Sequence, residues 1–432
     1  MKFINYFAIL IIIISFGCSQ SGSNSSPPVP PAATGTNGTA GLPNGSVLPV
    51  VSGNNVMTLT VNGTLCNAAN SVGYLNKPCV SITICSTTNS NCQTIDDVLL
   101  DTGSYGLRVF SSVLNSNLNL APVTSGSKTV ADCQQYGGGS ADWGTVSMAK
   151  VILGNEPAVQ IPIEIIDSSF SQSSVCTTDS AGDTFTLDTD PVSTGYNAIM
   201  GVGLFAGDCG PDCTSDPDNG QYYACSGSTC TGITMAESAQ VSNPVASLPI
   251  DKNGVLIRLP NINLGGAPSL TGYLILGIGT QTNNTPSGVF DYNTTATDEF
   301  GQFTTSFNGT QIGFIDSGSN TLAFNGPENS GPSNLIDCPS SSNDSGYFCP
   351  SSTRSFTALD IANTGTASVT VPFQIGDALT LDSAFNVFSD IGSDDGGQGE
   401  FDWGLPFFIG RNVFVGLDGK TSPLGTGPYW GF

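Results

Sequence analysis

The chain has 432 residues, of which 39% are hydrophobic and only 10% are charged, and its formal net charge is −24 at pH 7. Nucleic acid and an anionic membrane surface would repel such an acidic chain, so we expect neither as a direct partner. The sequence contains no His, which excludes Ser-His-Asp and Cys-His catalysis and every zinc site that needs an imidazole. Hydrolytic chemistry would therefore depend on carboxylates, on Lys, or on a metal held by oxygen ligands.

Residues 1–18 have the pattern of a signal peptide. Lys2 precedes the apolar run FAILIIIISF, which is too short to span a bilayer as a mature helix. The run ends in SFGC at Cys18 and resembles a bacterial lipoprotein signal, which is cleaved before a Cys that is then lipidated, although Ser15 stands where Leu is typical. We expect an exported lipoprotein on the periplasmic or cell-surface side of a membrane, touching it only through the lipid. A secreted protein is the alternative.

Residues 19–55 are mainly Ser, Gly, Pro, Asn and Thr, and they predict a disordered tether because they offer little apolar surface to bury. From Val56 onward, alternating runs such as VMTLTVNG and YLILGIG predict strands. The 53 Gly and 26 Pro residues favour turns, and no stretch has a sustained helical period. The sequence therefore predicts a mostly β fold.

One short acidic motif occurs twice, as DVLLDTGS at residues 97–104 and IGFIDSGS at 312–319. A strand-like run begins 45 residues before each Asp, near Val56 and near Thr271. The motifs are followed by AIMGVG, with Gly201, and by FFIGRN, with Gly410. Three landmarks in the same order predict an internal duplication, with one half at 56–262 and the other at 263–432. A third Asp-Ser-Gly, at residues 344–346, lacks the apolar run before it.

The two motifs have residues suited to acid–base catalysis. Gly103 and Gly318 permit a sharp turn after each strand, and neighbouring hydroxyls can bond the turn and its carboxylate; these are Thr102, Ser104, Ser317 and Ser319. If the halves face each other, Asp101 and Asp316 share one proton, so one can activate water while the other donates to a carbonyl oxygen. This chemistry needs no metal, no other cofactor and no covalent intermediate. The alternative is that both Asp residues only cap turns in an inactive chain.

At these motifs the chain resembles the pepsin-like aspartic peptidases, over Val56 to Phe432. LLDTGSYGL and FIDSGSNTL resemble the two active-site motifs of that family, AIMGVG and FFIGRNVF its apolar-apolar-Gly elements, and GPYWGF its closing strand. The chain looks closest to a Cys-rich bacterial lipoprotein branch. The resemblance implies a bilobal, mostly β fold with the site in a cleft between the lobes. It also implies that Thr102 and Ser317 brace the two turns, and that Gly201 and Gly410 pack beside them.

The function implied is that of an aspartic endopeptidase, with Asp101 and Asp316 as the catalytic residues. Its substrate would be a peptide or an unfolded protein, and we expect a monomer. The alternative is a catalytically silent surface lipoprotein that keeps the fold and binds peptide or glycan in the cleft.

The resemblance also implies a hairpin flap over the cleft, for which the best match is the segment QYGGGSADWG. Tyr136 and Gly137 would then contact the substrate, with Trp143 as a rival candidate. The alternatives are a Tyr that covers only the base of its own hairpin and a Trp that anchors the core. Arg108 stands where the family usually has a Trp, and a cation near the two acids would lower their pKa values.

The chain has 13 Cys residues, and removal of Cys18 leaves an even number. We expect six disulfides, as is usual for an exported protein. Cys85 with Cys92 and Cys338 with Cys349 are plausible pairs, and a cluster could close on itself: Cys209, Cys213, Cys225 and Cys230. Zinc binding by that cluster is an alternative. The acidic stretch DCGPDCTSDPDNG could hold calcium, but solvated turns are the simpler interpretation.

Overall fold

The computed structural model describes residues 48–67, 69–70, 73–289, 291–293, 301–342, 344–364 and 367–432. The predicted signal peptide, Cys18 and most of the predicted tether lie outside these residues. Leu48 and Asn55, at the end of the predicted tether, are buried, and the Asn55 side chain donates to the Leu276 carbonyl at 2.9 Å. The folded part therefore begins before Val56, because the last residues of the predicted tether already pack against it.

The fold is mostly β, as predicted. In the described part of the chain, the largest sheet has 18 strands. They are β1 (Val56–Val61), β2 (Pro78–Cys85), β3 (Cys92–Asp101), β4 (Tyr105–Phe110), β5 (Ala121–Pro122), β6 (Thr124–Ser125), β7 (Lys128–Gln135), β8 (Ser140–Leu153), β9 (Val159–Ile166), β10 (Thr186–Leu187), β11 (Ala198–Val202), β12 (Tyr222–Ser226), β13 (Thr229–Gly232), β14 (Gly254–Arg258), β15 (Leu270–Leu276), β16 (Asp291–Asn293), β24 (Asn412–Gly416) and β27 (Tyr429–Gly431).

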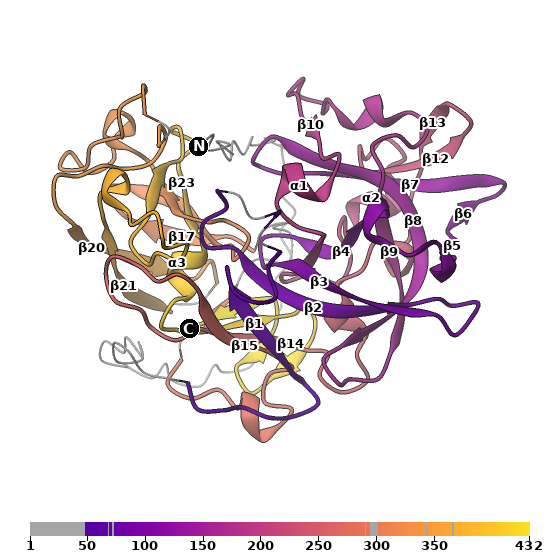
Figure 1. Cartoon of the computed structure of the whole chain (residues 1–432), viewed down its shortest axis with the longest axis horizontal. Helices are drawn as coiled ribbons and strands as arrows, with labels where there is room; N and C mark the ends of the chain where they lie inside the picture. The colour runs from indigo at the N-terminus through magenta and orange to yellow at the C-terminus, as the bar shows by residue number, and fades with distance from the viewer. Residues whose placement is uncertain are drawn as a thin grey trace, which may run out of the picture.

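A second sheet comes entirely from the later part of the chain and lies at the left of Figure 1, away from β7, β8 and β9 at the right. Its seven strands are β17 (Phe303–Ser306), β18 (Thr310–Ile315), β19 (Leu322–Phe324), β20 (Arg354–Ile361), β21 (Ser368–Ile375), β22 (Gly392–Asp394) and β23 (Glu400–Trp403). A small hairpin consists of β25 (Thr421–Ser422) and β26 (Gly425–Thr426).

Helices are short, as the Gly and Pro content predicts. The α-helices are α1 (Pro191–Thr194), α2 (Asp212–Ser215) and α3 (Leu405–Phe408). The 3₁₀ turns are η1 (Ser111–Val113), η2 (Ser116–Leu118), η3 (Ser173–Cys176), η4 (Glu237–Ala239), η5 (Pro244–Ser247), η6 (Thr282–Asn284), η7 (Pro327–Asn329) and η8 (Ala378–Thr380). In the part of the chain that is described, no helix is long and apolar enough to cross a membrane.

The two runs that open the predicted halves pair directly with each other. β1 and β15 are antiparallel, with Val56 opposite Ile275 and Val61 opposite Leu270. β14 pairs with both β15 and β24, so strands from both predicted halves form one continuous layer below the two sets of strands in Figure 1. The predicted boundary between residues 262 and 263 therefore falls in the connection between two hydrogen-bonded neighbours.

The same three-strand arrangement occurs twice. β11 is parallel to β3 and antiparallel to β4, and β23 is parallel to β18 and antiparallel to β19. In both copies the central strand, β11 or β23, lies between the strand that leads into the acidic motif and the strand that follows it. The last five residues of β3, residues 97–101, form its buried end, which carries Asp101. This repetition of local topology agrees with the predicted duplication.

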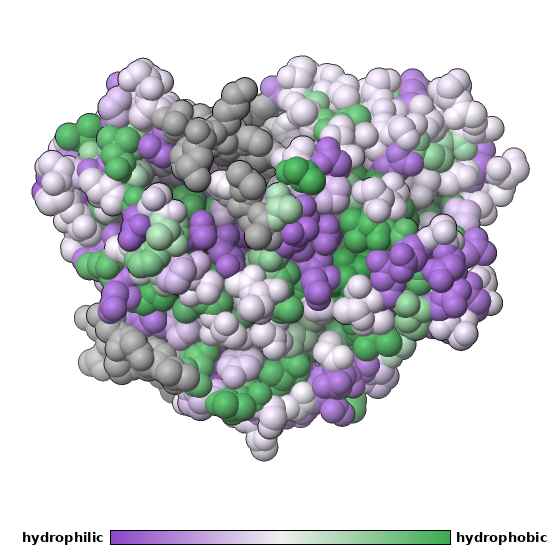
Figure 2. All heavy atoms as spheres, viewed as in Figure 1, coloured by the Kyte–Doolittle hydropathy of each residue, from purple (hydrophilic) through white to green (hydrophobic). Residues whose placement is uncertain are grey.

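Aromatic residues fill the core on the second sheet. Phe307 has edge-on contacts with Phe324, Phe373 and Phe401, at centroid distances of 5.2, 5.2 and 5.6 Å. Phe401 stacks on Trp403 at 4.1 Å. On the face shown in Figure 2, most residues have intermediate hydropathy and the strongly hydrophilic ones form small groups, as expected for a chain with few charges.

All 12 Cys residues after Cys18 form disulfides, as predicted. The expected local pairs are confirmed, and the four-Cys cluster closes as Cys209–Cys213 and Cys225–Cys230, which leaves it no thiolate for zinc. The remaining two pairs are Cys66–Cys79 and Cys133–Cys176.

Candidate active site

Asp101 is the last residue of β3, and the turn that follows holds its carboxylate. The Gly103 amide donates to Oδ1 of Asp101 at 2.8 Å, and the Ser104 hydroxyl donates to Oδ2. Both carboxylate oxygens are thus fixed by residues two and three positions further on. Asp101 is only 7% exposed, so these bonds replace most of the water that it would otherwise bind.

Asp316 follows β18 and is held in the same way. The Gly318 amide donates to Oδ1 at 2.7 Å, and the Ser319 hydroxyl donates to Oδ2 at 2.7 Å. The acceptor atoms and the spacing repeat those of the first motif. The sequence similarity of the two motifs is therefore also a similarity of hydrogen bonding.

Thr102 and Ser317 connect the two turns reciprocally. The Thr102 hydroxyl donates to the Ile315 carbonyl at 2.9 Å and accepts from the Ser317 amide at 2.9 Å. The Ser317 hydroxyl donates to the Leu100 carbonyl at 2.7 Å and accepts from the Thr102 amide at 3.1 Å. These four bonds join residues 213–217 positions apart, and both side chains are buried. They fix the two strand ends against each other.

The carboxyl groups of Asp101 and Asp316 meet between the braced turns. A Cβ placed on Gly103 would lie 2.6 Å from Cγ of Asp316, and one on Gly318 would lie 2.8 Å from Oδ1 of Asp101. Each turn therefore presents its bare Gly backbone to the acid of the other half. Any larger residue would push the two carboxyls apart.

The pKa of Asp101 is raised well above its usual value. Burial is the largest cause, followed by the charge of Asp316 and a hydrogen bond with it, while the bonds from Ser104 and Gly103 act in the opposite direction. Two carboxylates in contact cannot both ionise easily, so the pair retains a proton at a pH where an isolated Asp has lost its own. An acid and a base are thus available side by side.

Gly201 lies beside the first turn, as predicted, but Gly410 does not lie beside the second. Gly201 is in register with Asp101, and a Cβ on it would lie 2.6 Å from the Tyr105 amide. Trp403 lies opposite Ile315, so the next residue, Gly404, matches Gly201; a Cβ there would lie 1.9 Å from the Thr321 carbonyl. A Cβ on Gly410 would instead lie 3.3 Å from the Asn261 side chain. The prediction for Gly410 is wrong, because strand register selects Gly404.

Gly404→Ala should therefore destabilise the protein more than Gly410→Ala. The backbone at Gly404 has φ −66°, which Ala accepts, but the backbone carbonyl at 1.9 Å leaves no room, so we expect a loss of about 2–3 kcal/mol. At Gly410, φ is 80° and the nearest atoms belong to a side chain, so the cost is about 1–2 kcal/mol of backbone strain. Urea unfolding of both variants tests this, and a larger loss for Gly410→Ala would contradict the register.

Tyr136 directly follows β7, where the chain turns through Gly137 into β8. Its hydroxyl donates to Oδ2 of Asp142 at 2.8 Å, and its ring packs against a buried cluster that includes Leu99 and Ile199. Burial and the Asp142 charge raise the pKa of Tyr136, so the hydroxyl stays a donor. The ring thus packs near the strand that carries Asp101, while its hydroxyl bonds its own hairpin.

Trp143 is fully buried, and its indole N–H donates to the Phe170 carbonyl at 2.8 Å. It packs edge-on against Tyr223 at 5.6 Å. These contacts are those of a core anchor, which was the alternative role for this residue.

Arg108 is completely buried in a cluster of carboxylates. Its guanidinium lies 2.7 Å from Asp208, 2.9 Å from Glu164 and 3.4 Å from Asp132, all of them buried side chains. It also donates to the Tyr105 carbonyl at 2.6 Å. These three acids compensate the charge of Arg108. The raised pKa of Asp101 has burial and Asp316 as its main causes.

Tyr74 and Gly404 are parts of the site that the sequence did not reveal. The Tyr74 hydroxyl donates to the Gly318 carbonyl at 3.3 Å, across 244 residues of chain. No local pattern marks it. Gly404 follows Asp402 and Trp403, so it lacks the two aliphatic residues that mark Gly201.

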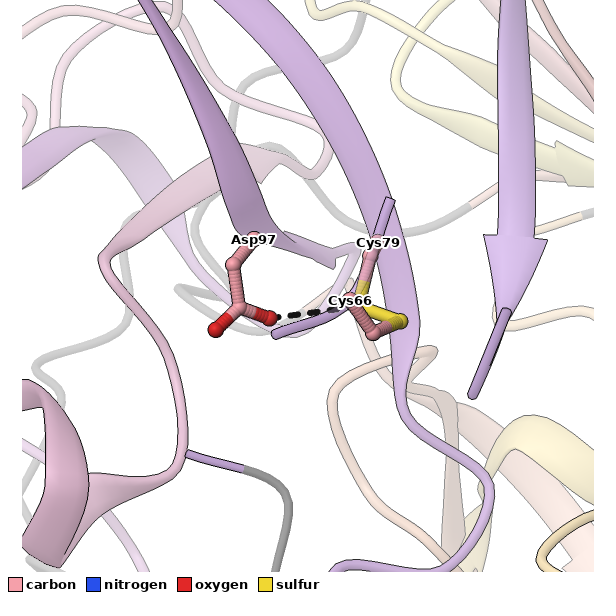
Figure 3. Close-up of side chains that lie close together, drawn as sticks. All are labelled: Cys66, Cys79 and Asp97. Atoms are coloured by element: carbon pink, nitrogen blue, oxygen red, sulfur yellow. Dashed lines mark hydrogen bonds between the residues drawn. A yellow bond between two sulfur atoms is a disulfide. The ribbon is translucent and has the colours of Figure 1, made fainter. Parts of the chain in front are cut away.

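One group of side chains in the described part of the chain has the spacing of a metal site: Cys66, Cys79 and Asp97. Figure 3 shows these residues together, but the two Cys residues form a disulfide of 2.04 Å and Oδ1 of Asp97 is 2.5 Å from the Lys77 ammonium. The disulfide leaves no thiolate to bind a metal, and the carboxylate of Asp97 is already paired with Lys77. The group is a structural brace.

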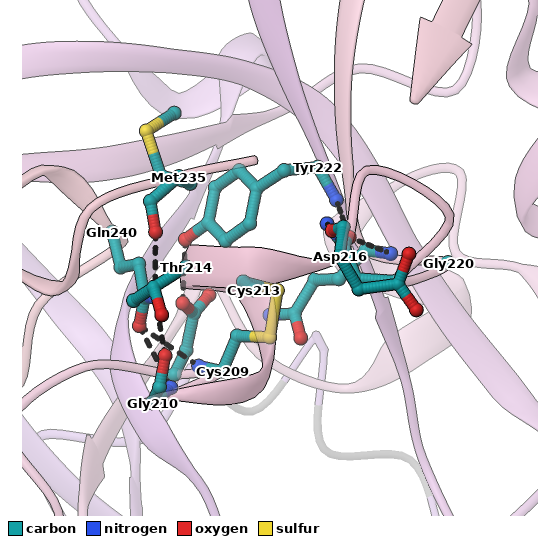
Figure 4. The surroundings of a disulfide bond; sticks show 12 residues. Cys209, Gly210, Cys213, Thr214, Asp216, Gly220, Tyr222, Met235 and Gln240 are labelled. Atoms are coloured by element: carbon teal, nitrogen blue, oxygen red, sulfur yellow. Dashed lines mark hydrogen bonds between the residues drawn. A yellow bond between two sulfur atoms is a disulfide. The ribbon is translucent and has the colours of Figure 1, made fainter. Parts of the chain in front are cut away.

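The acidic stretch considered for calcium folds around the Cys209–Cys213 disulfide, where the Gln240 side chain bonds both backbone groups of Gly210 (Figure 4). Asp216 accepts a backbone bond from Asp218 at 2.8 Å, and Asp208 accepts from the Tyr222 hydroxyl at 2.5 Å. The Asp216 carboxylate thus stabilises a turn, and the Asp208 carboxylate belongs to the cluster around Arg108. This agrees with the interpretation of the stretch as turns and not as a calcium loop.

The chain belongs to a family described as protein of unknown function (DUF3443), whose model matches residues 51–432. The match covers nearly all of the described structure. No curated protein matches the sequence.

Proposed function

We propose that this protein is an aspartic endopeptidase with a pepsin-like bilobal fold, and that Asp101 and Asp316 are its catalytic pair. The observation that carries the proposal is the symmetric arrangement of two braced acid turns. Each carboxylate is held by its own turn, each turn is bonded to the other, and both Gly residues face the opposite acid.

The pair would hydrolyse a peptide bond with one proton shared between two acids. The ionised carboxyl removes a proton from a bound water, and the water oxygen attacks the carbonyl carbon of the substrate. The protonated carboxyl donates its proton to the carbonyl oxygen, which gives a neutral tetrahedral intermediate. Collapse of this intermediate breaks the C–N bond. The leaving nitrogen takes a proton from the acid that gained one, and one hydroxyl of the intermediate returns its proton to the other carboxylate as the new C=O bond forms.

The substrate would be an extended peptide or an unfolded segment bound between the lobes through backbone hydrogen bonds and apolar pockets. The boundary of the lobes would lie near residue 262, with strands from both sides in the layer beneath the site. We further propose that the chain is exported and anchored by a lipid at Cys18, so its substrates would lie outside the inner membrane.

Cleavage of a mixed peptide library by the purified protein between pH 3 and pH 7 tests this proposal. We expect cleavage on the acidic side of neutrality that a statine-type inhibitor prevents and EDTA does not. Absence of inhibitor-sensitive cleavage at every pH would refute the enzyme and favour the silent, peptide- or glycan-binding alternative.

A further inference from the structure

Asp142 and Asp188 are two acids buried next to each other, away from the catalytic pair. β10 runs parallel to the start of β8, with Leu187 opposite Ala141, and the Asp188 amide donates to the Ala141 carbonyl at 2.9 Å. Asp188 and Asp142 follow directly along the two chains, and residues in register on neighbouring strands point to the same face, with backbones about 4.8 Å apart. Asp142 is 0% exposed and Asp188 is 7% exposed. Buried carboxyls are costly unless neighbours compensate them, so this pair needs an explanation.

Each of the two acids has a tyrosine hydroxyl beside it. The Tyr136 hydroxyl donates to Oδ2 of Asp142 at 2.8 Å, and the Tyr196 hydroxyl lies 3.5 Å from Oδ2 of Asp188. Both rings belong to the same buried cluster. Oδ1 of Asp142 has no hydrogen-bond donor in the described part of the chain. Because a buried oxygen of this kind normally has a partner, a proton on the neighbouring Asp188 carboxyl is the donor that the arrangement lacks.

The charges around the pair favour such a proton. The titratable and charged groups that face the pair come from the surrounding strands and turns, and they are Arg108 in β4, Asp132 in β7, Glu164 in β9, Tyr136 and Tyr196. The one cation among them, Arg108, is already paired with three acids. Burial raises the pKa of Asp142 to about 6, against the bond from Tyr136 and the charge of Arg108. Burial, followed by the charge of Asp142, raises the pKa of Asp188 to about 8.

The pair lies where β10 joins the hairpin formed by β7 and β8. β10 has only two residues, and the Thr186 amide donates to the Gly139 carbonyl at 2.9 Å. Gly139 ends the hairpin turn at residues 137–139, which are all Gly and give the turn little stiffness of its own. The Cys133–Cys176 disulfide ties the chain before β10 to β7. A displacement of β10 would therefore be local, and it would remove the support beside the turn.

We propose that Asp142 and Asp188 form an acid clasp, in which a proton shared between the two carboxyls holds β10 against the hairpin and loss of that proton releases it. Two carboxylates fixed side by side without a free cation repel each other, and a strand of two residues offers little to oppose that repulsion. The hairpin turn would then be held up to neutral pH and freed in alkaline solution. The inference goes beyond the proposed function and does not depend on it, since the clasp is defined by the hairpin alone.

Proteolysis of the folded protein by proteinase K at pH 6.5 and pH 9 tests the clasp without any need for catalysis. Cleavage within residues 177–190 is normalised at each pH to that of an unstructured peptide with the same sequence. Because proteolysis follows the population of the open form, we expect the wild type to be cut at least about tenfold faster at pH 9. Asp188→Asn keeps the shape of the side chain without its charge, so its two rates should agree within about threefold.

Asp142→Asn removes the same pair from the other strand and should behave like Asp188→Asn, whereas Asp418→Asn, at an exposed acid, should behave like the wild type. Equal rates for the wild type at both pH values would overturn the proposal. So would an Asp188→Asn variant that is cut as fast as the wild type at pH 9.

Urea unfolding of the wild type and Asp188→Asn gives a second readout. An acid with a raised folded pKa stabilises the fold below its unfolded pKa and loses that contribution as pH rises through the folded value. Relative to the wild type, Asp188→Asn should therefore be more stable at pH 8 than at pH 6, with the ratio of unfolding constants changing by up to about tenfold per pH unit. An identical difference at both pH values would show that Asp188 holds no proton in the folded protein and would overturn the clasp.

Discussion

Asp101→Asn and Asp316→Asn should each reduce kcat/KM for peptide cleavage by roughly 10³-fold, because each removes one member of the acid–base pair. Asn keeps the shape of the side chain and an oxygen that can accept the amide of Gly103 or Gly318. The fold should therefore survive, with a midpoint of thermal unfolding at pH 5 at least equal to that of the wild type, since the repulsion between two acids is removed. Steady-state kinetics and thermal unfolding of the purified variants measure both quantities.

The chain contains a matched control for these substitutions. Asp344 also precedes Ser and Gly, but it lies in a half-buried loop outside the braced turns. Asp344→Asn should keep full activity. The pairing would be contradicted if one of the two Asn variants at the site retained a tenth or more of wild-type activity while properly folded.

Arg108→Met should destabilise the protein by about 3–5 kcal/mol near neutral pH, the largest stability effect that we expect from a single substitution. It leaves three acids buried without their cation: Asp132, Glu164 and Asp208. Met fills a similar volume, so the loss reports charge and not an empty space. The free energy of unfolding in urea, compared with the wild type, measures it.

The loss at Arg108 should depend on pH. Burial raises the pKa of all three acids, and Arg108 is the group that most opposes this increase for Asp132. An acid with a raised folded pKa stabilises the fold below its unfolded value and loses that contribution as pH rises through the folded one. The Met variant should thus lose less free energy of unfolding at pH 5, where the acids can stay protonated, than at pH 8. Lys128→Met, at an exposed cation, is the control; an equal loss at both pH values would contradict the account.

The two turns that hold Asp101 and Asp316 could be predicted because the residues that form each turn lie close together in the sequence. Asp101, Gly103 and Ser104 lie within four consecutive residues and are joined by hydrogen bonds, and the same holds for Asp316, Gly318 and Ser319. The short-range disulfides were predictable for the same reason. The Cys133–Cys176 pair was not, because it depends on how β7 lies against η3, 43 residues away.

The remaining features depend on strand register and on distant partners. Gly404 could not be chosen over Gly410 without knowing that β23 ends beside the second turn, since Asp402 and Trp403 replace the expected aliphatic pair. Arg108 was recognised as unusual, but its three acids come from separate segments and no spacing in the sequence connects them. Tyr74 likewise reaches Gly318 only through the fold.

The central claim is that Asp101 and Asp316 form a single site around one water molecule. A crystal structure of the purified protein with a statine-type inhibitor at pH 5 tests this most directly. The account predicts that the inhibitor hydroxyl takes the place of the water, within hydrogen-bonding distance of both carboxyls. An inhibitor bound elsewhere, or two carboxyls separated and each bonded only to its own turn, would contradict it.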